Sequence, residues 1–559
     1  MTETKSGSEV IVQSLIDAGT EVIFGFPGGR VIPLYDALYD APIKHILTRH
    51  EQGAAHAADG YARATGRVGV CITTSGPGAT NLVTGLATAY MDSVPIVALT
   101  GQVTVAMIGN DSFQEADIYG ITIPVTKYNY LVKKADRLAQ VIKEAFYIAG
   151  TGRPGPVLID IPSDLQVAEI RPRKVGPVKL PGYAPLAKGH PRQIEAMVKA
   201  IQTARRPVIY AGGGVVSSGA SKELRRFIKK TRIPITTTLL GKGIYPEDDE
   251  LSLGMLGMHG TKYANRTIYE SDLVIAIGVR FDDRVAGDVQ KFAPLAKVIH
   301  IDIDPAEIGK RLGVDIPIVG DVKSILSMVN QQVRTESRKR WLDRVAQWKK
   351  EQPLTYEDDG TLKPQYIIET LSDMTKGEII ITTDVGQHQM WAAQYIKSAE
   401  PRRFITSGGL GTMGYGFPAA IGAQVGCPDM TVVSLSGDGS IQMCIQELAT
   451  IRQFNIPVKI FIFNNSCLGM VRQWQQFFWE KRYSSTLLEF NPDFCKVAEG
   501  YEIPAFMVTE PNEVKPVIDK VLHIDGPVLV DFRVAPEENV MPMIPAGGGQ
   551  TDFFGEGDE

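Results

Sequence analysis

The feature that most constrains how this chain can fold is a glycine-rich turn carrying an aspartate, followed one helix and one strand later by paired asparagines. An apolar run predicts a β-strand over 431–435, and the turn Ser-Gly-Asp-Gly, with Asp438, comes directly after it. The pattern then predicts a helix over 441–454 and a second buried strand over 456–463, which leads into Asn-Asn with Asn465 as its second residue. Because the parallel strands of a βαβ unit open onto one edge of the sheet, we expect Asp438 and Asn465 to lie close together.

This edge has the chemistry of a metal–phosphate site. Glycines let the backbone approach a phosphate closely, and the free N–H groups of the following helix attract an anion. The carboxylate of Asp438 and the amide oxygen of Asn465 are hard oxygen ligands of the kind that Mg²⁺ takes, together with phosphate and water. A lone Gly-Asp-Gly turn is weak evidence, since a capping Asp gives the same local sequence. With the paired asparagines, the pattern resembles the signature through which thiamine-diphosphate (ThDP) enzymes hold the cofactor by a divalent ion.

Length and composition restrict the class of protein. A chain of 559 residues is too long for one core and is expected to form three or four domains. The net charge of −5 and the lack of a long basic run argue against nucleic acid as a partner. No apolar run reaches the length of a membrane span, and no signal or transit peptide is visible, so no membrane partner is expected. The five cysteines form no CxxC pair, which indicates a reducing cytoplasm without zinc or disulfides.

Alternating strand and helix patterns predict an α/β fold of three doubly wound parallel-sheet domains, of the ThDP-dependent decarboxylase type. Prolines interrupt one linker, a charged segment forms the other, and the acidic, glycine-rich tail is expected to be mobile without ligand. The predicted boundaries are 1–165 for an N-terminal pyrimidine-binding domain, 166–190 for a linker, 191–334 for a central domain, 335–363 for a second linker, 364–534 for a C-terminal diphosphate-binding domain and 535–559 for the tail.

The first and third domains look like copies of each other. In the first domain a strand is followed by Ser-Gly-Pro-Gly at 75–78, a helix and Val-Pro-Ile-Val at 94–97. In the third domain the same order recurs: a strand, Ser-Gly-Asp-Gly at 436–439, a helix and Ile-Pro-Val-Lys at 456–459. This predicts a duplicated domain, although unrelated doubly wound domains share such turns. The second copy has Asp438 where the first has Pro77, so only the second can ligate a metal through this turn.

A ThDP enzyme also needs a poorly solvated carboxyl group against the aminopyrimidine ring of its cofactor. Glu51 fits this role because it directly follows a predicted strand over 45–50 and precedes an alanine- and glycine-rich helix over 52–65. The plainer interpretation is a glutamate in the first turn of that helix, where the helix dipole favours it.

Longer motifs extend the resemblance over most of the chain, about 6–534. On these residues the chain resembles acetohydroxyacid synthase (acetolactate synthase), catalytic subunit. The motifs lie at 49–52, 75–81, 113–115, 152–156, 257–260, 280–284, 384–391, 408–414 and 469–474.

The resemblance implies a transferase that decarboxylates pyruvate on ThDP and joins the two-carbon unit to a second 2-oxoacid. Pyruvate as acceptor gives 2-acetolactate, and 2-oxobutyrate gives 2-aceto-2-hydroxybutyrate, which begin valine, leucine and isoleucine biosynthesis. The implied cofactors are ThDP, Mg²⁺ and FAD. The implied assembly is a homodimer or homotetramer with active sites at the dimer interface, together with a small regulatory subunit.

The same resemblance carries roles onto matching positions. The catalytic set is Glu51, Gln114, Lys127, Arg284 and Trp474, with Phe113 and Met258 along the substrate channel. The ThDP set is Gly29, Glu51, Val385, Gly386, Gln387, His388, Met413, Gly437, Asp438, Gly439, Asn465, Gly469 and Met470. Asp438, Asn465 and the backbone carbonyl of Cys467 are implied to hold Mg²⁺. The FAD set is Arg153, Gly212, Gly213, Gly214, His259, Arg280, Asp302 and Asp321.

Some of these residues also have a physical rationale and a plainer alternative. Arg284 offers a planar fork to the acceptor's carboxylate, but a surface ion pair would use the same residue. Trp474 can form an apolar wall that favours an ethyl over a methyl group by roughly 1–3 kcal/mol, or it can be a core aromatic. Lys127 can equally be a solvated lysine. The glycines at 212–214 follow a predicted strand without forming GxGxxG, so alone they carry little weight.

Two classes of alternative function remain. A pyruvate-oxidase-type ThDP enzyme would use the flavin for redox chemistry. Catabolic acetolactate synthase would lack FAD and the motif at 280–284, and glyoxylate carboligase would lack Glu51. A non-catalytic nucleotide-binding regulatory subunit would be expected to have lost Glu51, Asp438 or Asn465, and all three are present.

Overall fold

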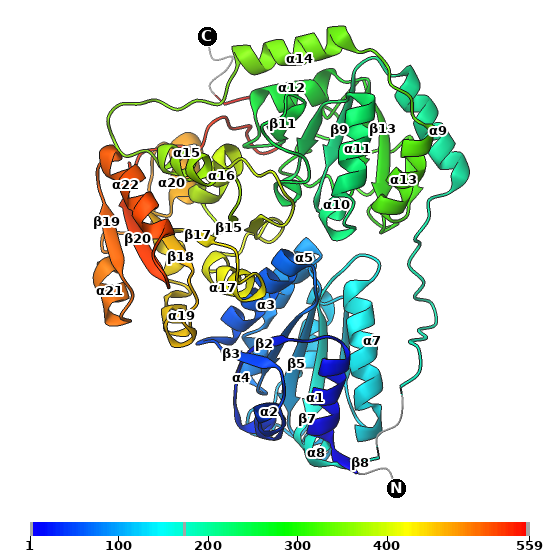
Figure 1. The fold of residues 1–559 in the computed structure, drawn as a ribbon, viewed down its shortest axis with the longest axis vertical. Coiled ribbons are helices and arrows are strands. Elements are labelled where there is room, and N and C mark those ends of the chain that lie inside the picture. Colours follow the sequence, from blue (N-terminus) through cyan, green and yellow to red (C-terminus); the bar gives the residue numbers. More distant parts are fainter. Residues whose placement is uncertain (1–3, 172–174, 555–559) are drawn as a thin grey trace.

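Three parallel six-stranded sheets form the frame of the molecule in the computed structural model, which describes residues 4–171 and 175–554 (Figure 1). Every pairing between neighbouring strands of these sheets is parallel. Parallel neighbours need a crossover connection, and helices supply it here. The predicted fold class, three doubly wound parallel-sheet domains, is confirmed.

The first sheet has the strand order β3-β2-β4-β5-β7-β6. Its strands are β2 (Val22–Phe26), β3 (Lys44–Leu47), β4 (Gly69–Thr73), β5 (Ile96–Gln102), β6 (Tyr128–Leu131) and β7 (Val157–Pro162). Its helices are α1 (Gly7–Asp17), α2 (Ile32–Tyr39), α3 (Glu51–Thr65), α4 (Pro77–Thr80), α5 (Val83–Asp92), α6 (Ile118–Thr122), α7 (Leu138–Gly150) and α8 (Ser163–Val167). A two-stranded antiparallel sheet of β1 (Lys5–Ser6) and β8 (Glu169–Ile170) lies beside it.

The middle sheet has the order β11-β10-β9-β12-β13-β14, which is the order typical of dinucleotide-binding domains. Its strands are β9 (Pro207–Ala211), β10 (Ile235–Thr237), β11 (Ser252–Met255), β12 (Leu273–Ile277), β13 (Lys297–Asp302) and β14 (Ile316–Val319). The helices around it are α9 (Pro191–Thr203), α10 (Gly213–Ser217), α11 (Ser221–Thr231), α12 (Lys262–Glu270), α13 (Val322–Gln332) and α14 (Lys339–Glu351).

The third sheet has the order β16-β15-β17-β18-β20-β19. Its strands are β15 (Ile380–Thr383), β16 (Phe404–Thr406), β17 (Val432–Gly437), β18 (Lys459–Asn464), β19 (Ala505–Val508) and β20 (Val528–Arg533). The helices are α15 (Pro364–Thr375), α16 (Gln387–Tyr395), α17 (Gly416–Gly426), α18 (Asp438–Ile441), α19 (Leu448–Phe454), α20 (Gly469–Phe478), α21 (Phe494–Gly500) and α22 (Pro511–Leu522).

The first and third sheets share one topology. Numbered along each sheet, both have the order 2-1-3-4-6-5, and the two stretches that look alike in sequence occupy the third and fourth strands of their sheets. The shared topology supports the predicted duplication. In both sheets the strand order reverses between the first and third strands, which is where ligands bind in open α/β sheets.

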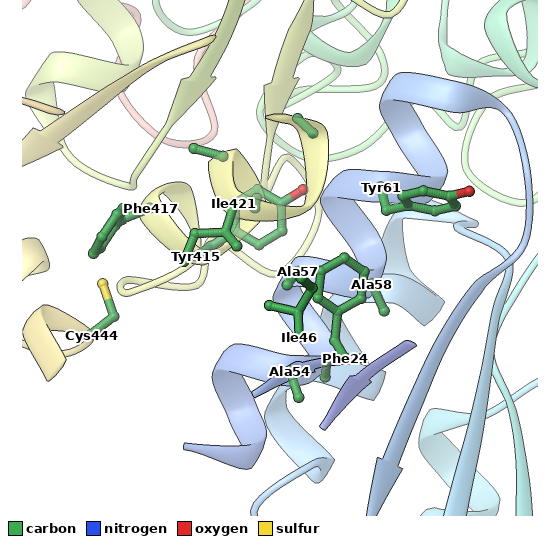
Figure 2. Close-up of a cluster of buried hydrophobic side chains, with 14 of the residues drawn as sticks. Phe24, Ile46, Ala54, Ala57, Ala58, Tyr61, Tyr415, Phe417, Ile421 and Cys444 are labelled. Carbon is green, nitrogen blue, oxygen red and sulfur yellow. The ribbon is translucent and has the colours of Figure 1, made fainter. Parts of the chain in front are cut away.

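The two copies pack against each other through helices α3 and α17. Their alanines form one core with side chains such as Phe24, Tyr415 and Phe417 (Figure 2). A Cβ on Gly60 would lie 2.0 Å from the carbonyl oxygen of Ala419, so the backbones approach as closely as only glycine permits. The first and third domains of one chain are therefore joined by a tight helix–helix contact.

Two segments differ from the sequence prediction, and the predicted mobility of the tail is not tested. The helix expected over 441–454 is broken into α18, a 3₁₀ turn at Ile445–Glu447 and α19. The segment predicted as a charged linker contains α14, whose Trp341, Val345 and Trp348 are buried, because its charges line only its outer face. The tail packs onto α20 as far as 554, where Phe554 stacks on Phe477 with ring centroids 4.3 Å apart, and the rest of the segment predicted to be mobile, 555–559, lies outside the described residues.

None of the helices in the described part of the chain has both the length and the apolar character that crossing a bilayer requires.

Candidate active site

The carboxyl edge of the third sheet places the predicted metal ligands together. Asp438 begins α18 at the end of β17, and Asn465 directly follows β18, the neighbouring strand. The Asp438 carboxylate is buried and accepts a hydrogen bond from Nδ2 of Asn491 at 2.7 Å. Burial raises the pKa of Asp438 to about 6, so a cation at this carboxylate would be favoured because it compensates the buried charge.

The ligand set at this edge suits a hard ion. The oxygens are one carboxylate, the Asn465 amide, whose Oδ1 accepts the N–H of Cys467 at 3.3 Å, and the backbone carbonyl of Cys467. Mg²⁺ takes one or two protein carboxylates and fills its remaining positions with other oxygens. Among residues 4–171 and 175–554 no group of three His, Cys, Asp or Glu side chains gathers as a metal-binding cluster, which fits a site with a single carboxylate. The residues present fit Mg²⁺.

Glycines shape the space beside these ligands. A Cβ on Gly437 would lie 3.0 Å from Cε1 of His388, and a Cβ on Gly469 would lie 2.1 Å from Oε1 of Gln387. Gly386 has φ +154°, which side-chain-bearing residues rarely adopt. Burial lowers the pKa of His388 to about 3, so its imidazole is neutral. Its Nε2 is buried with no partner in the described part of the chain, as expected of a group that faces a ligand.

Asp384 organises this cradle and was not among the predicted site residues. Its Oδ1 accepts the N–H groups of Val385 at 2.8 Å and Gly414 at 2.9 Å, and its Oδ2 accepts the N–H of Gly416 at 3.0 Å. Asp384 thereby ties the turn before α16 to the loop that carries Met413. It follows β15 directly at the point where the strand order reverses, and that position could have identified it from the sequence.

One continuous cavity of about 1260 Å³ lies between the three domains, and the first domain contributes Met91, Asp92, Ser93 and residues 150–154 to its lining. From the predicted ThDP and metal sets it is lined by Val385, Gly386, Gln387, His388, Met413, Gly437, Asp438, Gly439, Asn465, Cys467, Gly469 and Met470. From the predicted FAD set it is lined by Arg153, Gly213, Gly214, His259, Arg280, Asp302 and Asp321. Gly212 does not line the cavity; it caps α10 against the backbone of Gly278.

The middle-domain wall has the features of a nucleotide site. Gly213 and Gly214 open α10 after β9, next to the reversal of strand order between β9 and β12. Asp302 ends β13, and burial raises its pKa to about 6. Burial lowers the pKa of His259 to about 4, and its Nδ1 is buried without a partner among the described residues. These groups fit a dinucleotide such as FAD.

Arg284, Trp474 and Met258 meet in the same cavity. The Arg284 guanidinium lies over the Trp474 ring, 5.6 Å from its centroid, and its Nη1 is 3.9 Å from Sδ of Met258. The indole Nε1 of Trp474 is buried without a partner among the described residues. Arg284 keeps 58% of its side chain exposed, and its ion pair with Asp283 is long at 3.9 Å, so the charge is available to a ligand. A cation next to an aromatic wall can bind a small carboxylate.

Six predicted residues lie in the first domain; Arg153 lines this cavity, and the other five, Gly29, Glu51, Phe113, Gln114 and Lys127, do not. Glu51 begins α3, and its Oε2 accepts a hydrogen bond from Nδ2 of Asn81 at 2.9 Å. Phe113 is 81% exposed on the surface. Within one chain, the predicted site is therefore divided between two places.

Lys127 has a local role in this structure. Its Nζ donates to the carbonyl oxygens of Ile148 at 2.5 Å and Thr151 at 2.6 Å, and to the hydroxyl of Tyr183 at 2.9 Å. Burial lowers the pKa of Lys127 to about 8. The amine thus caps the carboxyl end of α7, a position that a cation stabilises.

Glu447 is the second residue that sequence reasoning missed. It belongs to the third domain, yet its fully buried carboxylate accepts the backbone N–H groups of Arg49 and His50, with Oε1 3.0 Å from each. Thr450 donates to its Oε2 at 2.7 Å. Glu447 therefore holds the start of α3, the helix whose first residue is Glu51.

Comparison with known proteins identifies the family. Models of thiamine pyrophosphate enzymes match in order: the N-terminal TPP binding domain at 5–121, the central domain at 194–329 and the C-terminal TPP binding domain at 384–532. The chain is 51% identical to the probable acetolactate synthase large subunit of Methanocaldococcus jannaschii over 98% of this chain and 95% of the relative. The chain belongs to the acetolactate synthase large subunits.

Other acetolactate synthases are similar over the full length. The large subunit of Corynebacterium glutamicum is 50% identical over 100% of this chain and 92% of its own. Acetolactate synthase 1, chloroplastic, of Zea mays is 49% identical over 100% of this chain and 90% of its own. The match to acetolactate synthases across archaea, bacteria and plants favours the carboligating enzyme over an oxidase-type or non-catalytic interpretation.

Proposed function

We propose that the chain catalyses the acetolactate synthase reaction, in which pyruvate loses CO₂ and its remaining two-carbon unit joins a second 2-oxoacid. The products would be 2-acetolactate from pyruvate and 2-aceto-2-hydroxybutyrate from 2-oxobutyrate, which lead to the branched-chain amino acids. The observation that carries the proposal is the single cavity onto which both the Asp438–Asn465 edge and the Arg284–Trp474 pair open. Family membership supports the same reaction.

ThDP would supply the reactive carbon that takes up the two-carbon unit, and the third domain would hold its diphosphate. Asp438, Asn465 and the Cys467 carbonyl would bind Mg²⁺, while the glycine turns let the backbone approach the phosphates. Met413 lines the same cavity and would contact the cofactor. The neutral His388 imidazole, whose Nε2 has no partner among the described residues, would contribute a hydrogen bond.

Arg284 and Trp474 would select the acceptor. The guanidinium pairs with the carboxylate of a 2-oxoacid, and the indole forms the wall against its alkyl group. Filling such a pocket with one more methylene group is worth about 1–3 kcal/mol, which is enough to favour 2-oxobutyrate over pyruvate.

The middle domain would bind FAD through its glycine turn and Asp302. The net carboligation transfers no electrons, so the flavin would have no redox duty in it. Arg153 reaches this wall from the first domain and pairs with Asp304 at 3.1 Å and Glu307 at 2.8 Å.

A second copy of the chain would complete the site. Glu51 is the carboxyl group expected to activate the cofactor, and it lies outside the cavity of its own chain. In a symmetric dimer, each first domain can present Glu51 to the cavity of the partner. Because relatives carry the name "large subunit", we also propose a small regulatory subunit as partner. The five unpaired cysteines are consistent with a reducing cytoplasm.

A product assay tests the proposed reaction. The purified protein is incubated with pyruvate, Mg²⁺, ThDP and FAD, with and without oxygen, and acetolactate, acetyl phosphate and peroxide are measured. We expect acetolactate at the same rate in both conditions. Oxygen uptake with peroxide would assign the protein to the oxidase branch and give the flavin a redox role.

A further inference from the structure

Asp92 occupies a position that local helix energetics disfavour. It is the last residue of α5, where the helix dipole destabilises a negative charge by about 0.3–1 kcal/mol. Its side chain is nevertheless completely buried. A residue that breaks a local rule in this way is expected to contribute to another part of the molecule.

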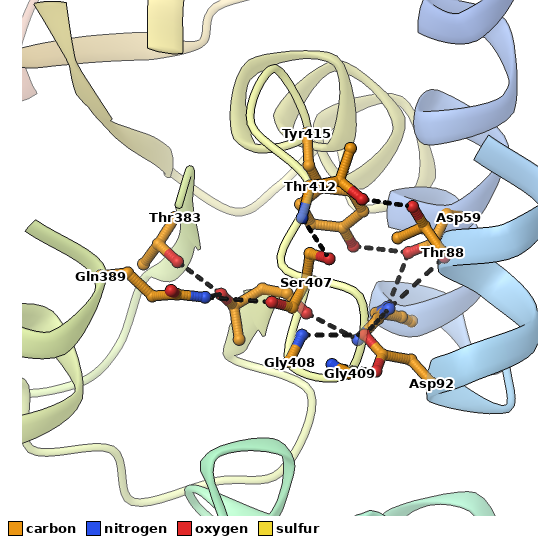
Figure 3. A network of polar contacts seen from close by, with 12 residues as sticks. Asp59, Thr88, Asp92, Thr383, Gln389, Ser407, Gly408, Gly409, Thr412 and Tyr415 are labelled. Atoms are coloured by element: carbon orange, nitrogen blue, oxygen red, sulfur yellow. Dashed lines mark hydrogen bonds and ion pairs between the residues drawn. The ribbon is translucent and has the colours of Figure 1, made fainter. Parts of the chain in front are cut away.

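The other part is a loop of the third domain, defined here as the cavity loop, residues 407–414. Oδ2 of Asp92 accepts the backbone N–H of Gly408 at 3.0 Å, and Oδ1 accepts that of Gly409 at 2.7 Å (Figure 3). Arg63 of α3 donates to Oδ2 at 2.7 Å and holds the carboxylate in place. Hydrogen bonds to an ionised acceptor are about twice as strong as neutral ones.

A second contact from α5 reaches the far end of the same loop. The hydroxyl groups of Thr88 and Thr412 lie 2.7 Å apart, and both side chains are buried (Figure 3). Thr88 and Asp92 are four residues apart, so they project from one face of α5. The next residue after Thr412 is Met413, which lines the cofactor cavity.

The loop has little freedom to move away from these contacts. A Cβ on Gly409 would lie 2.7 Å from Oδ1 of Asp92 and 3.0 Å from Nη2 of Arg280, so the three domains meet at this glycine. Gly411 and Gly414 have φ of +71° and +84°, a conformation that favours glycine. Within the loop the N–H of Thr412 donates to Oγ of Ser407 at 3.0 Å, and side chains of the third domain hold its ends, Gln389 at the Ser407 carbonyl and Asp384 at the Gly414 N–H. Asp92 and Thr88 are the contacts that come from the first domain.

We propose that Asp92, assisted by Thr88, is a positioning residue that sets the cavity loop and, through it, the place of Met413 in the cofactor cavity of the same chain. The inference rests on the proposed function in so far as Met413 contacts ThDP. It gives the first domain two tasks: it offers Glu51 to a partner's site, and it shapes the cavity of its own chain.

The test compares Asp92→Ala, Asp92→Asn and Thr88→Val with Asp17→Asn as matched control. Asp17 is also the last residue of a helix, but it is exposed, and among the described residues its carboxylate accepts a hydrogen bond from Gln13 of the same helix at 2.9 Å. Backbone hydrogen exchange over 404–414 is measured in the protein without cofactor, and Mg²⁺–ThDP affinity is measured by quenching of tryptophan fluorescence. Asp92→Asn keeps the size of the side chain and provides the test if the alanine variant does not fold.

We expect Asp92→Ala to speed exchange at Gly408 and Gly409 by about tenfold or more and to weaken ThDP binding by a similar factor, since two charge-assisted hydrogen bonds are lost. Asp92→Asn should lie between, and Asp17→Asn should change neither quantity. Wild-type exchange and wild-type affinity in both Asp92 variants would overturn the proposal.

A double-mutant cycle separates positioning from general stability. If Asp92 acts through Met413, Asp92→Ala should weaken ThDP binding much less in a Met413→Ala background than in the wild type. Additive losses would overturn the proposal. Hydrogen exchange needs no cofactor, so a wild-type protein that fails to bind ThDP would refute the proposed function, while exchange at 408–409 would still report on the loop.

Discussion

Replacing Glu447 by alanine should destabilise the contact between the first and third domains and misplace Glu51. The carboxylate is fully buried and is the hydrogen-bond acceptor of the Arg49 and His50 backbone N–H groups, both at 3.0 Å. Gly53 makes room for it, since a Cβ there would lie 2.6 Å from Oε1. Without the carboxylate both N–H groups lose their acceptor at the entrance to α3.

The magnitude follows from these groups. Each buried donor left without a partner costs about 1–3 kcal/mol. Thr450 also donates to the Leu47 carbonyl at 3.2 Å and therefore keeps a partner. The space left by the side chain can admit water, which lowers the cost, so we expect a loss of about 2–4 kcal/mol for Glu447→Ala.

Glu447→Gln is the matched control. In the native protein Oε1 accepts both N–H groups, and Oε2 also accepts that of Arg49 at 3.1 Å. A glutamine oxygen at the Oε1 position keeps one acceptor for both groups, while its amide can donate to the Thr450 hydroxyl. We expect this variant to lose less than about 1 kcal/mol and to keep most of the activity. Urea midpoints and hydrogen exchange at the first turn of α3 provide the measurement. An alanine variant as stable and as active as the glutamine variant would refute the reasoning.

The same residue predicts a pH dependence. Burial raises the pKa of Glu447 to about 7 from the ordinary value of 4.5. Between pH 4.5 and 7 the folded protein holds a proton on Glu447 that the unfolded chain has released. The stability that this bound proton contributes is complete below pH 4.5 and is lost as the pH rises through 7. The stability of the wild type relative to Glu447→Gln should therefore decline from pH 4.5 to 7. A constant difference would contradict the assignment.

Three further predictions concern the proposed active site. Glu51→Gln should leave ThDP bound but abolish turnover, because the amide cannot exchange a proton with the cofactor; near-normal rates would reject its role. Asp438→Ala should weaken Mg²⁺–ThDP binding by about a hundredfold or more in titrations, since it removes the only carboxylate of the proposed metal site, and unchanged affinity would count against that site. Trp474→Leu should lower the preference for 2-oxobutyrate over pyruvate by roughly tenfold in competition assays. An unaltered product ratio would exclude Trp474 as the apolar wall of the acceptor site.

Features that depend on local sequence were predictable. The apolar run after Thr431 became β17, the run before Asn464 became β18, and the rule that parallel strands open onto one edge brought Asp438 and Asn465 together. The duplicated topology followed from the repeated turn and strand pattern.

Features that depend on distant partners were not predictable. Glu447 contacts Arg49 across 398 positions of sequence, and Asp92 contacts Gly409 across 317, so no periodicity or spacing reveals either pair. The break before α19 was unpredictable for the same reason, because the 3₁₀ turn that interrupts the helix places Glu447 against the first domain. Residues proposed to contact the cofactor follow from motifs, whereas the residues that hold them in place follow from packing.

The central claim is that one site is built from two chains, and mixing two inactive variants tests it most directly. Glu51→Gln and Asp438→Ala protein are co-expressed in equal amounts, and acetolactate formation is compared with the wild type. If Glu51 acts on the partner's cavity, half of the dimers are mixed and each mixed dimer has one intact site, so about a quarter of wild-type activity returns. If each chain uses its own Glu51, every site carries a defect and no activity returns.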